Sequence, residues 1–355
     1  MSVNPGTMGD SPRRRRRARP GVNSSTVARA AGVSQSTVSR ALRGDPRVRE
    51  DTRRLIEETA ERLGYRPAWV ASPSPPRSRT IGVVVSDLTN PFFPTLLTPV
   101  HDELQIMGYR VVLFAERTDI PTGQEALINL LNQSIDGVLV TTATLDSKLG
   151  EALAGRNLPV VLLNRYVDGM DVDRVISDNY QGGRAAARHL LDLGHRAVGV
   201  IRGPANTSTS RDRHAGVIDG FADAGVVPDE RFVREGPYSH QCGYQNAREL
   251  LRLATPPTAL ICGNDVIAFG ALDAVKSLGL DVPDDVSVLG FDDVPMAAWE
   301  VFQLTTVRQP LPEMARTAVR LLVERIEHGD DITARRERLF ATSLVQRSTT
   351  QQVAR

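Results

Sequence analysis

The sequence predicts an α/β protein in which a three-helix N-terminal domain precedes a larger, two-lobed domain built on parallel sheets. Residues 22–66 have helical periodicity throughout, and a segment with four prolines follows at 67–79. From Thr80 onward, short runs of Val, Ile and Leu alternate with amphipathic helical segments, as in parallel sheets covered on both faces. A chain of 355 residues also exceeds the size that one hydrophobic core usually supports.

Three apolar faces define the helices expected within residues 22–66. The faces consist of Val27, Ala30 and Ala31 in the first helix, Val38, Ala41 and Leu42 in the second, and Leu55, Ile56, Thr59, Ala60 and Leu63 in the third. Gly32, the segment 44–46 and Gly64 end these helices. Ser34 directly precedes the second helix, where its hydroxyl can accept a hydrogen bond from a free backbone N–H.

Strands and helices alternate through the remainder of the chain. Strands are expected at Ile81–Val85, Val111–Phe114, Gly137–Val140, Val160–Leu163, Ala197–Ile201, Leu260–Cys262 and Val286–Gly290. Helices are expected at Pro94–Met107, Gln124–Leu131, Gly182–Leu193, Gly216–Ala224 and Val266–Leu278. These units suffice for two sheets, which predicts a cleft between two lobes.

The net charge of +1 conceals an uneven distribution. The residues through Arg66 carry a net charge of about +8, so the rest of the chain is acidic, as expected where one end meets phosphate. Residues 1–21 are polar and rich in Arg, Pro and Gly, and we expect them to form a disordered basic tail.

The sequence predicts a cytoplasmic protein in contact with the nucleoid and not with a membrane. Its apolar runs are far shorter than a membrane span, and no apolar stretch follows Arg13–Arg17 as an export signal requires. Cys242 and Cys262 lack the clustered spacing of a zinc site or a disulfide framework. We expect no metal, no cofactor and no catalytic residues.

The segment Thr26–Leu42 predicts a helix-turn-helix, with a small residue at the turn and polar residues on the outer face of the second helix. Gln can bond bidentately to adenine and Arg to guanine in the major groove, and hydroxyls near the helix start suit phosphates. The residues predicted to contact double-stranded DNA are Ser34, Gln35, Ser36, Thr37, Ser39, Arg40 and Arg43.

The string AGVSQSTVSRAL at Ala31–Leu42 resembles the signature of the lactose/galactose repressor (LacI/GalR) family, and LGYRP after the third helix fits the same pattern. The similarity extends over nearly the whole chain. Further matching strings are NPFF at 90–93, ISDNYQGG at 176–183, HLLDLGHR at 189–196, GND at 263–265, VPDDVSVLGFDD at 282–293 and LTTVRQP at 304–310.

The resemblance implies a three-helix DNA-binding domain at 22–66, a hinge at 67–79 and an effector-binding domain at 80–349 related to periplasmic sugar-binding proteins. Lobe one would comprise about 80–178 and 310–338, lobe two about 179–309 and 339–349, and a short tail 350–355. Members of the family typically form homodimers, some assemble further, and they bind palindromic operators. The predicted function is a transcriptional repressor controlled by a sugar-like effector.

The hinge departs from the family pattern. Its usual element is Ala-Arg-x-Leu, whose Leu wedges into the minor groove, whereas here Ser72 and Ser74 follow Ala71 in place of the Arg and Leu. We therefore predict that this protein does not kink its operator by leucine intercalation. Arg43 stands where Asn is common in the family, which adds a phosphate contact.

The matched strings also imply which side chains face the effector. Carboxylates, amides and Arg can pair with sugar hydroxyls, and aromatic faces stack on sugar rings. The implied effector-binding residues are Asn90, Phe92, Phe93, Asn164, Arg165, Asp178, Arg213, Tyr238, Asn264, Asp292 and Gln309, of which Arg213 and Asp292 are the main pair. Other roles stay open: Phe92 can belong to the core, and Asp178, Asn179, Asn264 and Asp265 can cap helices.

Other functions are weighed against this one. An enzyme is disfavoured because GxGxxG, GxxxxGK[ST], HExxH and GxSxG are all missing. A solute-binding protein of a transport system would need an export signal and would not need a basic helical domain. A regulator that has lost small-molecule sensing, or that responds to a protein corepressor, remains open. Nucleosides and purines remain alternative effectors.

Overall fold

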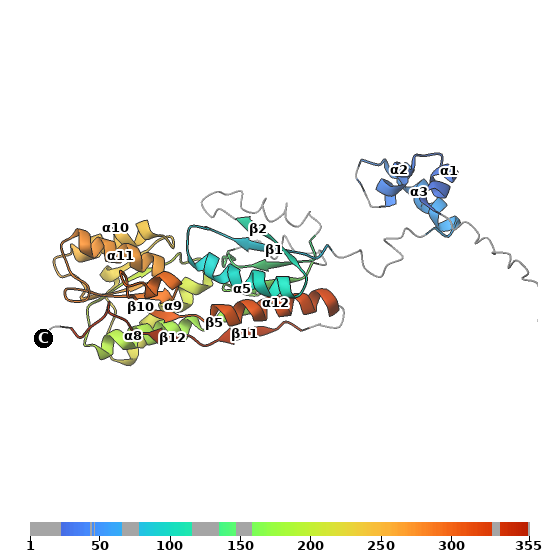
Figure 1. Ribbon diagram of the computed structural model, residues 1–355. Helices are drawn as coiled ribbons and strands as arrows, with labels where there is room; N and C mark the ends of the chain where they lie inside the picture. The colour runs from blue at the N-terminus through green and yellow to red at the C-terminus, as the bar shows by residue number, and fades with distance from the viewer. Residues whose placement is uncertain are drawn as a thin grey trace, which may run out of the picture. The chain divides into compact units, whose positions relative to one another are not determined.

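We describe the protein from a computed structural model, which covers residues 23–42, 45, 47–65, 78–115, 135–146, 158–328 and 334–353. The chain forms two compact units, Met1–Arg77 and Ser78–Arg355 (Figure 1), and each is described by itself. The predicted basic tail, Arg43, Ser72, Ser74 and the predicted helix at 124–131 lie outside the described residues.

The first unit contains α1 (Ser24–Ala30), α2 (Gln35–Leu42) and α3 (Glu50–Arg62). Asn23 caps α1 by accepting a hydrogen bond from the Thr26 backbone N–H. The Ser34 hydroxyl accepts from the Thr37 N–H at 3.1 Å, so the predicted cap of α2 is confirmed. One small core contains Val27, Ala28, Val38, Ala41, Ile56 and Ala60 of the three helices together with Val48, which lies between α2 and α3.

Two residues that we assigned to apolar helix faces are exposed instead. Ala30 lies outside the core, and Ala28 takes the buried position beside Val27. Leu55 is 48% exposed, because Ile56, Thr59 and Ala60 already fill the buried stripe of α3. The apolar pattern predicted the positions of the helices correctly, but the buried faces of α1 and α3 differ from the predicted faces by about one residue.

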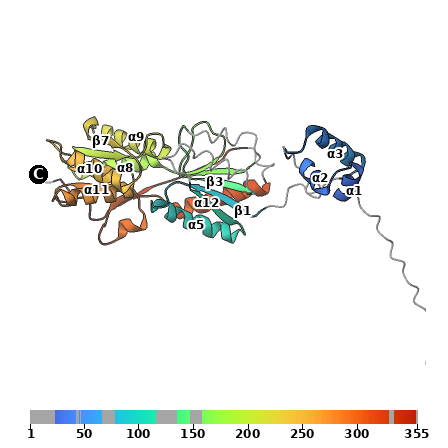
Figure 2. The same ribbon diagram turned by 90° about the horizontal axis from the view of Figure 1, so that it is seen from above.

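Lobe one of the second unit is built on a parallel six-stranded sheet, in the order β11-β5-β4-β3-β1-β2. Its strands are β1 (Thr80–Val85), β2 (Arg110–Ala115), β3 (Gly137–Val140), β4 (Val160–Leu163), β5 (Asp173–Ser177) and β11 (Glu337–Phe340). The helices α5 (Phe92–Ile106) and α12 (Leu311–His328) pack against each other beside this sheet (Figures 1 and 2).

Lobe two is built on a second six-stranded sheet, in the order β12-β10-β9-β8-β6-β7. Its strands are β6 (Val198–Arg202), β7 (Val233–Glu235), β8 (Ala259–Cys262), β9 (Ser287–Asp292), β10 (Thr305–Arg308) and β12 (Ser343–Val345). Only β12 runs antiparallel to its neighbour, so this sheet is parallel except at one edge.

Two pairs of helices cover the lobe-two sheet (Figure 2). One pair is α8 (Asn179–Asp192) with α9 (Ser208–Asp223), and the other is α10 (His240–Leu251) with α11 (Asp265–Ser277). Two short 3₁₀ helices, Glu230–Phe232 and Pro295–Ala298, lie in its loops. The predicted α/β architecture with two parallel-dominated sheets is confirmed.

The chain passes between the lobes at three places: from β5 to α8, from β10 to α12, and from β11 to β12. These crossovers bring the carboxyl ends of strands from both sheets to the region where the lobes meet. Ligands of open α/β sheets bind outside the carboxyl ends of their strands, so this arrangement positions the candidate site described below.

Several elements were predicted too short or not at all. The helix expected at Gly216–Ala224 begins eight residues earlier, at Ser208, because the Thr207 hydroxyl caps it and its first turns are polar. The elements α10, α12, β5, β7 and β10 to β12 were not predicted. The edge strands among them are short, and the three strands β7, β11 and β12 are not fully buried, so they show no continuous apolar run.

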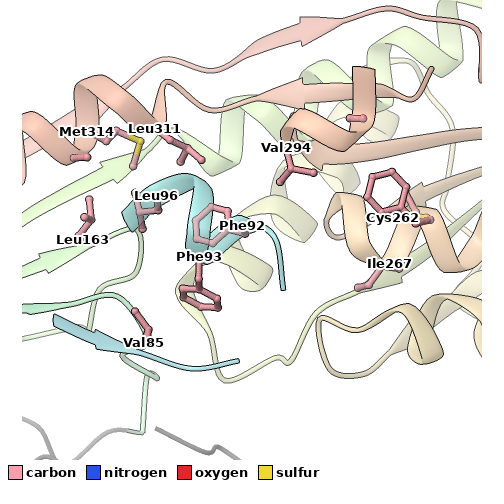
Figure 3. Close-up of a cluster of buried hydrophobic side chains, with 14 of the residues drawn as sticks. Val85, Phe92, Phe93, Leu96, Leu163, Cys262, Ile267, Val294, Leu311 and Met314 are labelled. Carbon is pink, nitrogen blue, oxygen red and sulfur yellow. The ribbon is translucent and has the colours of Figure 1, made fainter. Parts of the chain in front are cut away.

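One apolar cluster continues from lobe one into lobe two. Figure 3 shows Phe92 and Phe93, at the start of α5, with Leu163, Leu311 and Met314 on one side and Val294, Cys262 and Ile267 on the other. The two aromatic rings meet edge to face, with their centroids 5.4 Å apart. The core interpretation that we left open for Phe92 is therefore confirmed, and Phe93 shares it.

Candidate functional site

The helix-turn-helix presents a polar surface along α2. Gln35, Ser36 and Arg40 are exposed, and Val38 and Ala41 on the opposite side are buried. The side-chain amide of Gln35 donates to the hydroxyl of Ser24 on α1 at 2.8 Å. This bond joins the two helices at the end where α2 begins.

Hydroxyl groups gather at the N-terminus of α2. The Ser34 hydroxyl lies 2.8 Å from that of Ser36 and 2.7 Å from that of Thr37. Helix N-termini attract phosphate because their free N–H groups and the helix dipole favour negative charge. The arrangement has the polar groups that a recognition helix needs, and contact of these residues with DNA stays a prediction.

A buried polar network of the second unit surrounds Arg213, on α9. Its guanidinium donates to the Asn179 side-chain oxygen at 2.8 Å, to the Gly263 carbonyl at 2.6 Å and to Asp292 Oδ1 at 3.2 Å. The carbon of the guanidinium lies 3.7 Å from the centroid of the Phe291 ring. Arg213 and Asp292 are both buried, so the predicted pair forms an ion pair shielded from water.

The network continues from lobe two into lobe one through Gln309. The Gln309 amide donates to Asp292 Oδ1 at 2.7 Å, and its oxygen accepts from the Ser177 hydroxyl at 2.6 Å. Ser177 ends β5 in the lobe-one sheet, whereas Asp292 ends β9 in the lobe-two sheet. The chain of bonds therefore spans the junction between the lobes.

A second carboxyl group, that of Asp265, lies near Asp292. It accepts hydrogen bonds from the Thr306 hydroxyl at 2.5 Å and from the Val294 N–H at 2.8 Å. Burial and the neighbouring charge of Asp292 raise the pKa of Asp265 well above its ordinary value. Burial also raises the pKa of Asp292, to about 6, although Arg213 and Gln309 favour its ionised form.

The backbone is unusual where these side chains meet. Asp292, Asp293 and Asn164 have φ angles of 120°, 58° and 76°, a region that residues other than glycine rarely adopt. Such strain persists only where the surrounding structure enforces it, and it is concentrated at functional sites.

Lobe one contributes Asn90, Asn164 and Arg165. The Asn90 amide donates to the backbone carbonyl of Tyr238 in lobe two at 3.5 Å. The Arg165 guanidinium carbon lies 5.6 Å from the Tyr238 ring centroid, and the Tyr238 hydroxyl lies 3.2 Å from that of Thr209. Among the described residues the buried Oδ1 of Asn164 has no hydrogen-bond partner, so it can accept a bond from a ligand.

Two predicted site residues cap helices. Asp178 accepts from the Gln181 N–H at the start of α8, and Asn264 accepts from the Ile267 N–H at the start of α11. The capping interpretation is thus confirmed for both, whereas contact with an effector stays a prediction. Asp265 is the first residue of α11, and Asn179 binds Arg213, so neither of these two is a cap.

Three residues of the network were not predicted as site residues: Ser177, Asn179 and Asp265. All three belong to the strings ISDNYQGG and GND that carry the resemblance, so the signal was present. We chose the neighbouring Asp178 and Asn264 instead, because the sequence does not show which way each side chain turns at the end of a strand.

A pocket in lobe two opens beside Arg213. Its wall includes the apolar side chains of Val200, Val217, Ile261 and Phe291. Its polar lining includes Arg202, Ser210 and His214.

No helix of the described residues has the length and apolar character of a membrane span.

Two family models match parts of this chain. The model of the bacterial regulatory proteins of the lacI family matches residues 25–68, and that of the periplasmic binding protein-like domain matches residues 187–350. The HTH-type transcriptional repressor PurR of Photobacterium profundum is 31% identical over 303 residues, which cover 85% of this chain and 91% of that repressor. The PurR of Erwinia tasmaniensis is 32% identical over 303 residues, or 84% and 89% of the two chains.

This chain belongs to the LacI family. Among solved structures, a transcriptional regulator CelR in complex with cellobiose has 31% identity and a TM-score of 0.71, covering 93% of this chain and all of that one. The lac repressor dimer bound to operator and an anti-inducer has 29% identity and a TM-score of 0.69, covering 94% and 100%. The LacI-family member is thus a DNA-binding transcriptional regulator with a ligand-binding domain, and the relatives named here are regulators and not enzymes.

Proposed function

We propose that this protein is a repressor that binds a palindromic operator as a homodimer and is controlled by a small polyhydroxylated effector, a sugar or sugar derivative. The observation that carries the proposal is the buried network from Arg213 through Asp292 and Gln309 to Ser177. It presents charged and amide groups at the junction of the lobes, where a bound molecule can contact both. Effector binding can then change the relation between the lobes.

The chemistry of the site supports a ligand rich in hydroxyl groups. Arg213 and Asp292 offer a donor fork and an acceptor, and Asn164 offers a further acceptor. Sugar hydroxyls both donate and accept, so they can use all three. Two structural relatives support this class, since one was solved with cellobiose and a LacI-family regulator of Enterococcus faecium with ribose. The latter is 29% identical, has a TM-score of 0.68, and covers 78% of this chain and all of that one.

Operator binding by two copies is supported by the lac repressor, which was solved as a dimer on its operator. Twofold proteins bind twofold sites, and each α2 would then read one half-site. Lobe two also exposes two large apolar side chains: Trp299 is 53% and Val301 is 78% exposed, and Trp299 stacks on Phe302. We propose that a second copy covers these side chains.

A second candidate is a regulator that has lost small-molecule sensing or that responds to a protein corepressor. One observation favours it. Three of the five N–H groups of the Arg213 guanidinium already donate to the protein, so the site's own groups occupy much of its hydrogen-bonding capacity.

The two candidates are separated by a thermal-shift screen of the intact protein against sugars, sugar phosphates, nucleosides and purines. An effector at 100 times its Kd adds about 2.7 kcal/mol to stability, a shift of several degrees. We expect a sugar to raise the melting temperature of the wild type, and Arg213→Ala to lose the shift. Arg184→Ala, which removes an exposed pair with Asp223 on the same two helices, should keep it.

The same compound should then change the affinity of the protein for DNA selected from a random duplex library, as measured by fluorescence anisotropy. If no compound in the panel shifts the melting temperature while the selected DNA is still bound, the second candidate replaces the first. If Arg213→Ala keeps the shift, the effector binds elsewhere.

A further inference from the structure

We propose that Tyr166 is a positioning residue of the effector site, because it latches lobe one to the first turns of the helix that carries Arg213. Tyr166 lies three residues after β4 in lobe one. Its hydroxyl donates to Asp212 Oδ2 at 2.8 Å and accepts from Arg211 Nη2 at 2.6 Å. Its backbone N–H donates to the Ser208 hydroxyl at 3.0 Å. All three partners belong to α9 in lobe two.

Cations from both lobes also cover the Tyr166 ring. The guanidinium carbon of Arg174, on β5 of lobe one, lies 4.6 Å from the ring centroid, and that of Arg211 lies 5.4 Å from it. Arg174 is held in turn by Glu337 of β11. Cation–π contacts gain strength when they are shielded from water. The ring therefore bridges one fixed cation of each lobe.

Further bonds near Tyr166 also join lobe one to lobe two, and the edge of the lobes where they lie is called the rim. Arg211 pairs with Asp168 of lobe one at 2.6 Å. The Leu145 N–H of lobe one donates to the Asn206 carbonyl of lobe two at 2.7 Å, and the Asn206 amide lies 3.3 Å from Asp146. We call Leu145, Tyr166, Asp168, Asn206, Ser208, Arg211 and Asp212 the latch. Separation of the lobes along this rim would break all of its bonds together.

The latch acts on a rigid helix. A Cβ atom on Gly183 of α8 would lie 2.1 Å from the Arg213 carbonyl oxygen, and one on Gly216 of α9 would lie 2.0 Å from the Tyr180 carbonyl oxygen. The backbones of α8 and α9 are thus in direct contact, and α9 cannot shift without α8. Because Arg213 follows Asp212 directly, the position that the latch fixes for α9 is also the position of the Arg213 guanidinium.

An exposed ion pair alone would carry little of this effect. Arg211 and Asp168 are 39% and 65% exposed, and such pairs contribute weakly. Tyr166 is different, because it is partly buried and its hydroxyl bonds to two residues of the other lobe; burial and the bond to Asp212 also raise the pKa of its phenol to about 12. Its hydroxyl connects Asp212 to Arg211, so we assign the main contribution to Tyr166.

The role in effector control rests on the proposed function, but the latch itself does not. We therefore test it without effector, by hydrogen exchange and mass spectrometry on the full chain. The Leu145 amide is the diagnostic probe. It donates to the Asn206 carbonyl of lobe two and not to Tyr166, so a change in its protection caused by a substitution at Tyr166 reports on the contact between the lobes.

Tyr166→Phe keeps the ring and removes the hydroxyl. A net hydrogen bond contributes about 1 kcal/mol, so we expect exchange of the Leu145 amide to become about five-fold faster. Tyr180→Phe is the matched control: the Tyr180 hydroxyl donates to Asp219 at 2.6 Å beneath Arg184, but all three residues belong to lobe two. It should leave Leu145 unchanged.

Asp168→Ala, at an exposed position, provides a second variant that leaves the Tyr166 side chain itself intact, and it should accelerate the Leu145 amide by a smaller factor. An unchanged Leu145 amide in Tyr166→Phe overturns the latch, even if residues next to position 166 exchange faster. Equal acceleration in Tyr180→Phe also overturns it. Neither outcome depends on whether the thermal-shift screen finds an effector.

Discussion

Both lobes of the second unit bury carboxyl groups, but the positive charge that surrounds these groups differs between the lobes. In lobe one, the Asp173 side chain is fully buried between two guanidiniums, those of Arg325 on α12 and Arg336 before β11. Burial opposes its ionisation, but the bonds from these two residues outweigh that cost and lower the pKa of Asp173. In lobe two, Asp265 and Asp292 are buried together, Arg213 pairs with Asp292, the charge of Arg165 also favours ionisation of Asp292, and the pKa of each carboxyl group is nevertheless raised.

The difference separates a structural role from a binding role. Asp173 also accepts the Arg336 backbone N–H, so it joins α12 and β11 to the strand β5 that it begins. Its partners leave nothing for a ligand to add. The pair in lobe two has too little positive charge for two ionised carboxylates. Groups with such perturbed pKa values at a polar junction are typical of functional sites.

The largest expected effect comes from removing Asp173. Asp173→Ala removes a fully buried carboxylate from two guanidiniums whose side chains are 20% and 21% exposed, which should lower the free energy of unfolding by about 3–5 kcal/mol in urea titrations. Asp292→Ala should cost less, because Arg213 keeps Asn179 and the Gly263 carbonyl, and Asp265 loses a repulsive neighbour. A greater loss in Asp292→Ala than in Asp173→Ala would reverse the comparison.

The pH dependence of stability should have opposite signs in the two lobes. The folded protein holds the proton of Asp292 up to a pKa of about 6, above the ordinary value of 3.8, so ionising it costs stability as pH rises from about 4 to 6. Relative to Asp292→Asn, the wild type should lose at most about 3 kcal/mol over this window. The lowered pKa of Asp173 gives stability that is present above 3.8 and is lost as pH falls through its folded value.

Differential scanning calorimetry of the wild type and Asp292→Asn at a series of pH values measures the first of these effects. A difference in melting temperature that stays constant from pH 4 to pH 7 would show that Asp292 is ionised throughout, and that Arg213 compensates it as fully as Arg325 and Arg336 compensate Asp173.

The smallest effect provides the reference for an exposed pair. On α12, the same helix that carries Arg325, Arg316 pairs with Glu313 at 3.1 Å, and the two side chains are 42% and 55% exposed. Arg316→Ala should change the free energy of unfolding by less than about 0.5 kcal/mol. The test compares the thermal unfolding of Arg316→Ala with that of Arg325→Ala. If both variants lose a similar amount of unfolding free energy, burial does not distinguish these two ion pairs.

The sequence motifs contain the residues of the site, but they do not show which of their side chains bond to one another. The strings ISDNYQGG, GND and GFDD each place two or more polar residues at the end of a buried strand. Asp292 of the last string, predicted as an effector-binding residue, forms an ion pair with Arg213. In the other two strings the neighbours Asn179 and Asp265 belong to the network, while Asp178 and Asn264 cap helices.

The reason is local geometry. A strand gives way to a helix within two residues at these places, and the φ angle of each residue decides where its side chain turns. Periodicity of 2 or 3.6 no longer applies there. The residues of the latch were missed for a further reason: Tyr166 and Asp212 are 46 positions apart, and no pattern within either segment marks the other.

The sequence by itself determined the basic N-terminal domain with its three helices, the alternation of buried strands with helices, and the family. Each of these depends on short-range order, such as a capping hydroxyl, an apolar stripe or a continuous apolar run. The tertiary structure alone decided which carboxyl groups share a guanidinium, how one apolar cluster continues through both lobes, and where the rim of one lobe is bound to the other. Those contacts join strand ends far apart in the chain, and their partners are selected by the order of strands in two sheets.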